Sequence, residues 1–382
     1  MRLAILTTHP VQYYAPLLRE LARRVDLVVF YAMNPSPAQQ AEGFGTSFRW
    51  DVDLTDGYEH AFLANVSARP HTGRFDGCDT PEIAERLGEG RFDAVLALGW
   101  HVKSQLQGIA AALRQGLAVL VRGDSQRGLQ PSRARRAAKR VAYPLLLRAF
   151  RAALYVGHRN RAFYRHYGFP EARLFHSPHA VDTAYFAARA TRAARLALRE
   201  RLGVGEADDV VLFAGKLVPF KRPLDVVEAA ALLRGRGRRV HLLVAGSGEL
   251  CDALEALAEA RGVPLHPLGF VNQSGMPAVH AAADVLALPS TGRETWGLVA
   301  NEALACGTPI VVSDAAGCAP DLAGADAAGR VFPTGNVAAL AAALEATLER
   351  PPGREAIRAT SDAHGIDRAA DGVLAALEAT RR

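Results

Sequence analysis

Residues 284–314, DVLALPSTGRETWGLVANEALACGTPIVVSD, decide the fold that we expect for this chain. The stretch begins with a short apolar run, passes through a polar loop into a helix-like segment from Trp296 to Ala305, and stops at Gly307 before a β-branched run. Glycine commonly follows the last turn of a helix, because it adopts the left-handed backbone conformation without steric cost. Continuous apolar runs joined by a helix are typical of buried parallel strands. The stretch therefore predicts one strand–helix–strand unit of a parallel sheet.

The same alternation of apolar runs and helical patterns extends along all 382 residues. The runs that we predict as strands are 2–8, 25–32, 92–100, 117–123, 209–217, 240–246, 284–290 and 309–314. A chain of this length exceeds what one hydrophobic core usually organises. We therefore predict an α/β fold with two Rossmann-like domains, each a doubly wound parallel sheet. Ligands of such sheets bind at the carboxyl ends of the strands, so we expect the site residues to follow strands and to face a shared cleft.

A charged helical pattern and a polar turn, residues 183–209, separate the two halves. They indicate a boundary between an N-terminal domain, 1–187, and a C-terminal domain, 188–365. The tail, 366–382, has the apolar spacing of one helix face. Residues 34–58 are rich in Pro, Gly, Ser and polar side chains, so we expect a long exposed loop there.

The bulk composition excludes several classes of protein. Apolar residues make up 49% and charged residues 22% of the chain, which is typical of a globular protein rather than a disordered one. The four cysteines have no CxxC spacing, so we expect neither a disulfide framework nor a zinc site. No stretch reaches the eighteen or so uninterrupted apolar residues of a membrane span, and the first apolar run lacks the pattern of a signal peptide. We therefore expect a cytoplasmic protein.

One strongly basic segment stands out from the moderate net charge of +6. Residues 132–154 place seven Arg and Lys side chains beside a leucine-rich stretch. A basic amphipathic helix of this kind can lie on an anionic membrane surface, and a packing helix with a solvated arginine face fits the pattern as well. The basic residues are not interleaved with aromatic ones, so the sequence does not indicate nucleic-acid binding.

Cations gather after the first strand of the second half. Lys216 stands at the predicted strand end, and Lys221 and Arg222 directly precede Pro223, which suits the first position of a helix. Cations beside a helix N-terminus hold phosphate groups through charge and backbone N–H donors. A solvated turn is the alternative interpretation of these residues.

Two carboxylates flank the helix start in the opening stretch. Glu294 lies in the loop, Glu302 lies on the predicted helix, and Gly297 stands between them. With a rise of about 1.5 Å per residue, Glu302 lies roughly 7 to 8 Å along the axis from Gly297, so the two carboxylates would contact different parts of an extended ligand. Gly297 would allow a ligand to approach the backbone, and the positive end of the helix favours an anion. Either glutamate alone also fits an ordinary surface position.

These motifs together resemble a known family. FAGKLVPFKRP (213–223), GSGEL (246–250), LGFV (268–271) and ETWGLVANEALACGTPIVVSD (294–314) are similar to the C-terminal half of the retaining GT-B glycosyltransferases of family 4, with their E-x7-E signature. Residues 156–186 resemble the segment of those enzymes that leads into the interdomain linker. The resemblance covers most of the chain and is strongest in the second half. It implies a GT-B fold whose terminal helix returns to the N-terminal domain.

The resemblance implies that the second domain holds a nucleoside-diphosphate sugar, linked to UDP or GDP. Lys216 and Lys221 match the basic pair that grips the diphosphate, although the family commonly has arginine at the position of Lys216. Glu294 matches the glutamate that contacts the sugar hydroxyls, and Glu302 the one that binds the ribose. Gly297 and Leu298 match the helix start that binds the diphosphate. Phe270 and Val271 match the stretch that frames the nucleobase.

The N-terminal domain is implied to bind the acceptor, and here the chain departs from the family. Many relatives have a catalytic histidine where this chain has Arg122, Gly123 and Asp124. Asp124 and His101, which both follow predicted strands, are therefore the candidate catalytic residues of this half, beside Glu294 and Lys221. The first predicted strand is followed by His9 and Gln12 instead of the family's glycine pair, so side chains would replace backbone contacts there.

The implied reaction is transfer of the sugar to an acceptor hydroxyl group with retention of configuration. Preorganised cations and N–H groups would stabilise the charge that develops on the leaving diphosphate, a term worth roughly 3 to 4 kcal/mol for one well-placed donor. No cofactor is expected and no metal ion is required, because no acidic cluster accompanies the lysines. The acceptor is open: a lipid-linked glycan, a small molecule or a protein. Contact with a membrane through residues 132–154 would place the protein at the inner face of the cytoplasmic membrane.

Three functions other than transfer are alternatives for this chain. A Rossmann dehydrogenase needs G-x-G-x-x-G after a strand, and GSGEL at 246–250 lacks the third glycine. A sugar-nucleotide epimerase on the same scaffold is the closer alternative, because a fold does not decide a function. A non-catalytic protein that binds sugar nucleotides is the third.

Overall fold

The computed structural model describes residues 1–40, 45–127, 133–324 and 328–381. The chain divides into two compact units that each contain a parallel sheet. The first unit comprises Met1–Gln39, Asp53–His179 and Ile366–Arg382, and the second comprises Gln40–Val52 and Ala180–Gly365. The predicted α/β fold of two Rossmann-like units is confirmed.

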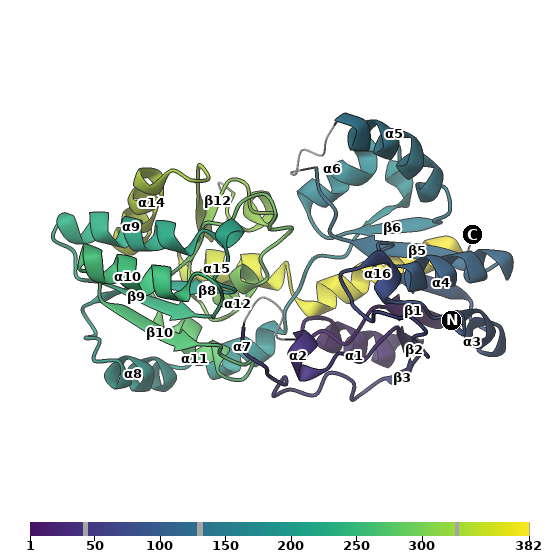
Figure 1. The fold of residues 1–382 in the computed structure, drawn as a ribbon, viewed down its shortest axis with the longest axis horizontal. Helices are drawn as coiled ribbons and strands as arrows, with labels where there is room; N and C mark the ends of the chain where they lie inside the picture. Colours follow the sequence, from purple (N-terminus) through teal and green to yellow (C-terminus); the bar gives the residue numbers. More distant parts are fainter. Residues whose placement is uncertain (41–44, 128–132, 325–327, 382) are drawn as a thin grey trace. The chain divides into compact units, whose positions relative to one another are not determined.

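The first unit has a seven-stranded parallel sheet within the described residues, in the order β3-β2-β1-β4-β5-β6-β7 (Figure 1). The strands are β1 (Arg2–Thr7), β2 (Asp26–Tyr31), β3 (Glu59–Phe62), β4 (Ala94–Ala97), β5 (Ala118–Gly123), β6 (Ala152–Tyr155) and β7 (Leu174–His176). The helices are α1 (Tyr14–Arg24), α2 (Pro37–Gln40), α3 (Ile83–Glu89), α4 (Lys103–Arg114), α5 (Arg133–Leu147), α6 (His158–His166) and α16 (Ile366–Thr380), with short 3-10 turns η1 (Phe75–Gly77) and η2 (Glu171–Arg173). The central strands are almost entirely buried, as their continuous apolar sequences predict.

The second unit has a six-stranded parallel sheet within the described residues, in the order β10-β9-β8-β11-β12-β13. The strands are β8 (Asp209–Ala214), β9 (Val240–Ala245), β10 (Leu265–Gly269), β11 (Val285–Leu288), β12 (Ile310–Ser313) and β13 (Gly329–Phe332). The helices are α7 (Thr183–Arg189), α8 (Arg192–Arg201), α9 (Pro223–Gly235), α10 (Cys251–Arg261), α11 (Met276–Ala282), α12 (Val299–Ala305), α13 (Ala319–Leu322), α14 (Val337–Glu349) and α15 (Arg354–Asp362), with a 3-10 turn η3 (Pro219–Lys221).

All eight predicted strands are present, and the strands without a predicted apolar run are mostly short edge strands. β3 and β7 form the two edges of the first sheet and β13 one edge of the second, and each of them keeps side chains partly or fully exposed. An edge strand packs on fewer neighbours, so its sequence need not be apolar. The chain passes from the first unit to the second after His179, ahead of the expected boundary after Ala187, because α7 packs on α11 and α12 of the second unit.

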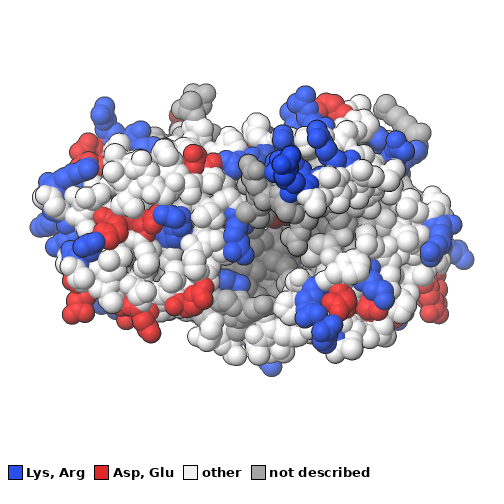
Figure 2. All heavy atoms as spheres, turned by 45° about the horizontal axis from the view of Figure 1, so that its top comes forward, with Lys and Arg blue, Asp and Glu red and all other residues white. Residues whose placement is uncertain are grey.

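The basic segment forms α5 and then returns to the sheet as β6, so the helix ends at Leu147 instead of continuing to residue 154. Figure 2 shows a group of Lys and Arg side chains over the region of α5 and α6. Val141 and Leu145, four residues apart on α5, are 68% and 59% exposed. No helix in the described part of the chain has both the length and the apolar character to cross a membrane.

The last helix, α16, is an integral part of the first unit. It packs on α1, β6 and β7, and in Figure 1 it lies in yellow among the early elements of the chain. Arg24 of α1 donates hydrogen bonds to Asp371 (2.7 Å) and Asp367 (3.1 Å) of α16. Gly372 allows the closest approach, since a Cβ atom there would lie 1.9 Å from the carbonyl oxygen of His176 at the end of β7.

We predict that Gly372→Ala destabilises the first unit. The added methyl group must push α16 away from β7, and overpacking of this kind costs about 1 to 3 kcal/mol. The matched control is Gly235→Ala in α9, where a Cβ atom meets nothing within 4 Å. Urea denaturation of both variants is the measurement. A Gly372→Ala protein as stable as the control would contradict the proposed packing.

Candidate functional site

Two loops of the second unit meet at the carboxyl edge of its sheet. One follows β8 and contains Lys216 and Lys221, and the other follows β11 and contains Glu294. The N–H group of Thr291 donates to the carbonyl oxygen of Phe220 across 2.8 Å, and the guanidinium group of Arg293 lies 5.0 Å from the centre of the Phe220 ring. The loops approach because β8 and β11 are paired neighbours in the sheet.

An ion pair joins the two loops. The ammonium group of Lys221 donates to the carboxylate of Glu294, which also accepts a hydrogen bond from the Ser290 hydroxyl group at 3.2 Å. The side chains of Lys221 and Glu294 are only 15% and 12% exposed. Coulomb attraction is stronger at such partly dehydrated positions than in water. Since an ammonium group has three donors, Lys221 can keep Glu294 and still bind an anion.

Local sequence explains how Lys221 is positioned. Pro219 begins the turn η3, and Arg222 adopts the left-handed conformation with φ of 54° before Pro223 starts α9. The Arg222 guanidinium group is held by Asp225 of α9 at 2.6 and 3.0 Å. The chain therefore reverses within four residues and presents Lys221 at the sheet edge, where its Nζ atom lies 3.9 Å from the ideal Cβ position of Gly215.

The start of the helix after β11 differs from the prediction. α12 begins at Val299 rather than at Trp296, whose indole N–H donates to Asn301 at 2.8 Å and which is itself buried. Gly297 has φ of 99°, and a Cβ atom there would lie 2.6 Å from Leu288 and 3.6 Å from Glu294. Within the described residues, the N–H groups of Gly297 and Leu298 donate no backbone hydrogen bond. These N–H groups are therefore available to an anion beside Glu294 and Lys221.

Glu302 lies on α12 as predicted, but its side chain is buried. It is 2% exposed, and one carboxylate oxygen lies 3.2 Å from Nε2 of His280, which is completely buried in α11. Nδ1 of His280 has no hydrogen-bond partner among the described residues. If Nε2 of His280 carries the proton, it donates to Glu302, and only the lone pair of Nδ1 has no hydrogen-bond partner. If Nδ1 carries the proton instead, a buried donor and a buried acceptor both lack partners, which costs more free energy. The histidine was not a sequence candidate, because nothing in its local pattern distinguishes it from a packing residue.

Lys216 and the loop after β10 complete the expected set in the second unit. Lys216 is partly exposed and directly follows Gly215 at the end of β8. Phe270 and Val271 follow β10 at the same edge of the sheet, and the Phe270 ring stacks on Phe48 with 3.9 Å between the ring centres. The structure thus brings Lys221, Glu294 and Gly297 together, whereas Glu302 is held against His280.

The candidates of the first unit also follow neighbouring strands. His9 follows β1, His101 follows β4 and Asp124 follows β5, and these three strands are adjacent in the sheet. Burial, together with the charge of nearby His101, lowers the pKa of His9 to about 4. The backbone N–H of His101 donates to the Gln105 side chain at 3.0 Å.

Arg122, one of the three residues in the region where many members of the resembled family have histidine, is buried. Its guanidinium group donates to the Ser177 hydroxyl (3.1 Å) and to the carbonyl oxygens of Ser177 (3.2 Å) and Pro178 (2.7 Å). Burial lowers the pKa of Arg122, and electrostatic interactions with Tyr14 and Asp124 oppose that shift. Asp124 therefore has a buried cation close to it, which the sequence did not indicate.

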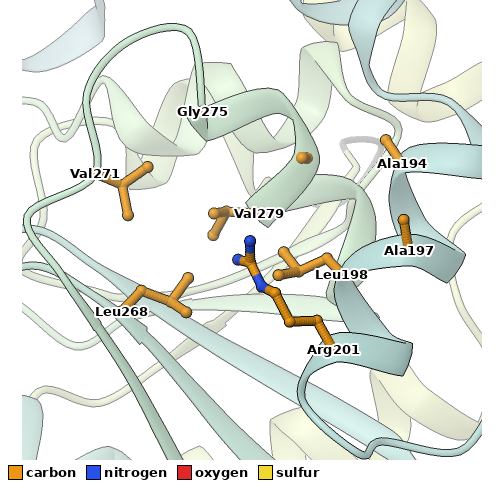
Figure 3. Close-up of a pocket in the computed structure, with 9 residues that line it drawn as sticks. Ala194, Ala197, Leu198, Arg201, Leu268, Val271, Gly275 and Val279 are labelled. Carbon is orange, nitrogen blue, oxygen red and sulfur yellow. The ribbon is translucent and has the colours of Figure 1, made fainter.

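A separate pocket of about 380 Å³ lies between α8, β10 and α11. Figure 3 shows the Arg201 side chain directed into this pocket, between Leu198 and Val279. Only Val271 among the expected site residues lines it. The pocket is therefore not the place where the lysines and glutamates gather. No group of three or more His, Cys, Asp or Glu suited to a metal ion occurs in the described ranges.

Comparisons with known proteins find similar sequences, mainly in the second half of the chain. Residues 195–363 match the family model described as Glycosyl transferases group 1, and this range contains all the candidate residues of the second unit. The chain is 34% identical over 215 residues to D-inositol 3-phosphate glycosyltransferase of Jonesia denitrificans, which covers 53% of this chain and 50% of that protein. It is 36% identical over 156 residues to a GDP-mannose-dependent alpha-(1-6)-phosphatidylinositol monomannoside mannosyltransferase of Mycolicibacterium smegmatis, covering 39% of this chain and 40% of that one. The chain spans about half or less of the length of these curated relatives.

The structure is similar over nearly its whole length to a solved crystal structure. The crystal structure of Anabaena Alr3699/HepE in complex with UDP and glucose matches with a TM-score of 0.73 and covers 99% of both chains. Sequence identity is only 17%, so this likeness concerns the fold. The GT-B fold class of two Rossmann-like domains is thereby confirmed.

The pKa of His9 generates a prediction about acid stability. Between pH 6.5 and about 4 the unfolded chain protonates this histidine and the folded protein does not. Stability is therefore lost as the pH falls through this window, by about 3 kcal/mol for a shift of this size. His9→Gln should remove that part of the pH dependence, and urea denaturation of both proteins at pH 7 and pH 4 measures the difference. Parallel pH profiles of the two proteins would show that His9 protonates freely in the folded state.

Proposed function

We propose that this protein transfers a sugar from a nucleoside-diphosphate sugar to an acceptor hydroxyl group with retention of configuration. The observation that carries the proposal is the convergence of Lys221, Glu294 and the N–H groups of Gly297 and Leu298 at one edge of the second sheet. Cations and N–H donors bind the diphosphate, and the carboxylate binds sugar hydroxyl groups. The group 1 family match and the UDP-bound structural neighbour support a nucleotide-sugar donor.

Each candidate residue has a role in this proposal. Lys216 and Lys221 hold the diphosphate without a metal ion, and Glu294 orients the sugar. Glu302, which contacts His280 through one oxygen, binds a ribose hydroxyl group. In the first unit, His101 and Asp124 contact the acceptor. The donor carries UDP or GDP, and the acceptor is a lipid-linked glycan, a small molecule or a protein.

The reaction proceeds on one face of the sugar. The bond between the anomeric carbon and the diphosphate oxygen breaks, and its electron pair stays on the diphosphate. The acceptor oxygen bonds to the anomeric carbon on the same face, and its proton passes to the leaving phosphate oxygen. Lys221 and the N–H groups near Gly297 stabilise the charge that develops on that phosphate. Neither glutamate attacks the sugar in this mechanism.

We predict that Glu294→Gln lowers turnover of the donor about 100-fold, the order of loss for removal of one preorganised polar contact at a reacting centre. The assay measures release of UDP or GDP from nucleotide sugars in excess EDTA, where the wild-type protein should remain active. The matched control is Glu228→Gln, because Glu228 forms a comparable ion pair with Arg261 on the surface of the same unit.

Several outcomes of this assay would contradict the proposal. Wild-type turnover by Glu294→Gln would remove the residue from the site, and loss of activity in EDTA would contradict the metal-independent mechanism. A trapped covalent glycosyl-enzyme would refute reaction on one face. Release of an epimerised sugar without acceptor would favour an epimerase, and donor binding without any turnover would favour a binding protein.

We also propose that α5 contacts an anionic membrane surface. Val141 and Leu145 are exposed on the same face of a helix that carries exposed arginines, including Arg136 and Arg140. Apolar side chains that insert beside cations bind anionic lipid surfaces. Single exposed apolar residues are common, so the pairing with the basic side chains is what motivates the proposal.

Binding to vesicles tests this contact. The wild-type protein should sediment with vesicles of anionic phospholipid and not with neutral ones, and the double variant Val141→Asp/Leu145→Asp should lose most of this binding. The control Val66→Asp/Leu113→Asp adds the same charge at exposed apolar positions elsewhere in the first unit. Equal binding by both double variants would show that α5 is not the contact.

A further inference from the structure

A short segment from the first half of the sequence folds onto the candidate site region of the second unit. Residues 48–51, called here the docked segment, lie between α2 and β3 in sequence, yet they belong to the second unit. The Asn272 side chain donates to the carbonyl oxygen of Arg49 at 2.6 Å and accepts from the N–H of Asp51 at 3.3 Å. With these two hydrogen bonds, the Asn272 side-chain amide binds the docked segment in the way that a backbone amide of a neighbouring strand would.

Asp51 secures the other side of the docked segment. Its carboxylate accepts hydrogen bonds from the N–H of Ser274, at 3.2 and 3.3 Å, and from the Ser274 hydroxyl group. Asn272 and Ser274 both belong to the loop between β10 and α11. The docked segment is therefore held to that loop by side-chain hydrogen bonds from both partners. The sequence predicted an exposed loop here, because its polar composition does not reveal a docking partner.

The docked segment brings two aromatic rings onto Phe270. Phe48 is stacked on Phe270 with 3.9 Å between the ring centres and 25° between the planes. Trp50 meets both rings edge-on, at 5.0 Å from Phe48 and 6.3 Å from Phe270. All three side chains are partly exposed. A partly exposed aromatic group of this kind offers a flat surface to a planar ligand.

This aromatic group lies at the edge of the sheet that carries the cations. Gly269, which precedes Phe270, accepts a hydrogen bond at 2.7 Å from the N–H of Gly246 after β9. Gly246 in turn contacts Gly215 after β8 so closely that a Cβ atom on it would lie 1.9 Å from the Gly215 carbonyl oxygen. The residue after Gly215 is Lys216, so a continuous series of backbone contacts connects the aromatic group with the lysines.

We propose that Phe48 forms, with Phe270, the stacking surface for the base of the donor nucleotide. This inference rests on the proposed function. If Lys216 and Lys221 hold the diphosphate, the base, which the ribose links to the diphosphate, needs a binding surface nearby. The base stacks on an outer face of the ring pair. The base does not enter between the two rings, because their centres are 3.9 Å apart and the rings are already in contact. A base stacked between them would need the rings to be about twice the carbon–carbon contact distance apart. Asp51 is a positioning residue, since it holds the docked segment without touching the ligand.

Calorimetry with three ligands tests this role of Phe48. Loss of one stacking ring weakens base binding by about tenfold, so Phe48→Ala should bind UDP or GDP about tenfold more weakly than the wild type. Inorganic pyrophosphate has no base, so its affinity should not change. Phe48→Trp should retain nucleotide binding. The matched control is Phe75→Ala, because Phe75 is an exposed aromatic residue of the first unit.

Variants of Asp51 test the positioning of the segment. Asp51→Ala should weaken nucleotide binding as Phe48→Ala does, and Asp51→Asn should restore part of it, because an amide oxygen still accepts from the N–H of Ser274. Wild-type nucleotide affinity in Phe48→Ala would overturn the inference. Tighter binding would also overturn it, since the segment would then compete with the base, and so would an equal loss of pyrophosphate affinity. Failure of the wild-type protein to bind any nucleotide would instead overturn the proposed function.

Discussion

The ion pair between Lys221 and Glu294 is the interaction on which the candidate site depends. Its two residues come from loops after β8 and β11, which are neighbouring strands with Val211 opposite Val285. The pair forms only when both strands are in register, so the sheet determines the geometry of the site. Because both side chains are mostly buried, removal of either one leaves a charge with little solvent around it. The Lys221 ammonium group is therefore already held in place by Glu294 before an anionic ligand binds to it.

Each unit is completed by a segment from a distant part of the sequence. α16, at the end of the chain, packs on β6 and β7 of the first unit, and the docked segment packs on the β10–α11 loop of the second. Arg122 supports the first arrangement, because it holds Ser177, whose hydroxyl group donates to the carbonyl oxygen of Ala369 in α16. Non-local closures of this kind carry an entropic cost that the contacts must offset. The close approach at Gly372 and the hydrogen bonds of Asn272 show how each closure is stabilised.

Buried polar groups distinguish the two glutamates of the E-x7-E signature. Glu294 lies in a loop and contacts a lysine and a serine. Glu302 lies inside the helix layer against His280, where a charge needs a partner to offset the loss of water. The two residues therefore have different surroundings although they share one motif. The same reasoning applies to Arg122, whose burial is offset by two carbonyl oxygens and a hydroxyl group.

The sequence by itself determined the α/β class, the eight apolar strands and the placement of Lys221 and Glu294 after strands, because continuous apolar runs and residues placed after them report local burial and strand ends. Only the tertiary structure decided the edge strands, the start of α12 at Val299, the burial of Glu302 against His280 and the docking of Phe48 on Phe270. An edge strand has no apolar signature, and the partner of a buried polar or aromatic side chain is chosen by elements far away in the chain. The spacing of apolar residues along the sequence indicates which face of a helix or strand is buried, whereas the packing of the whole unit decides which residues that face contacts.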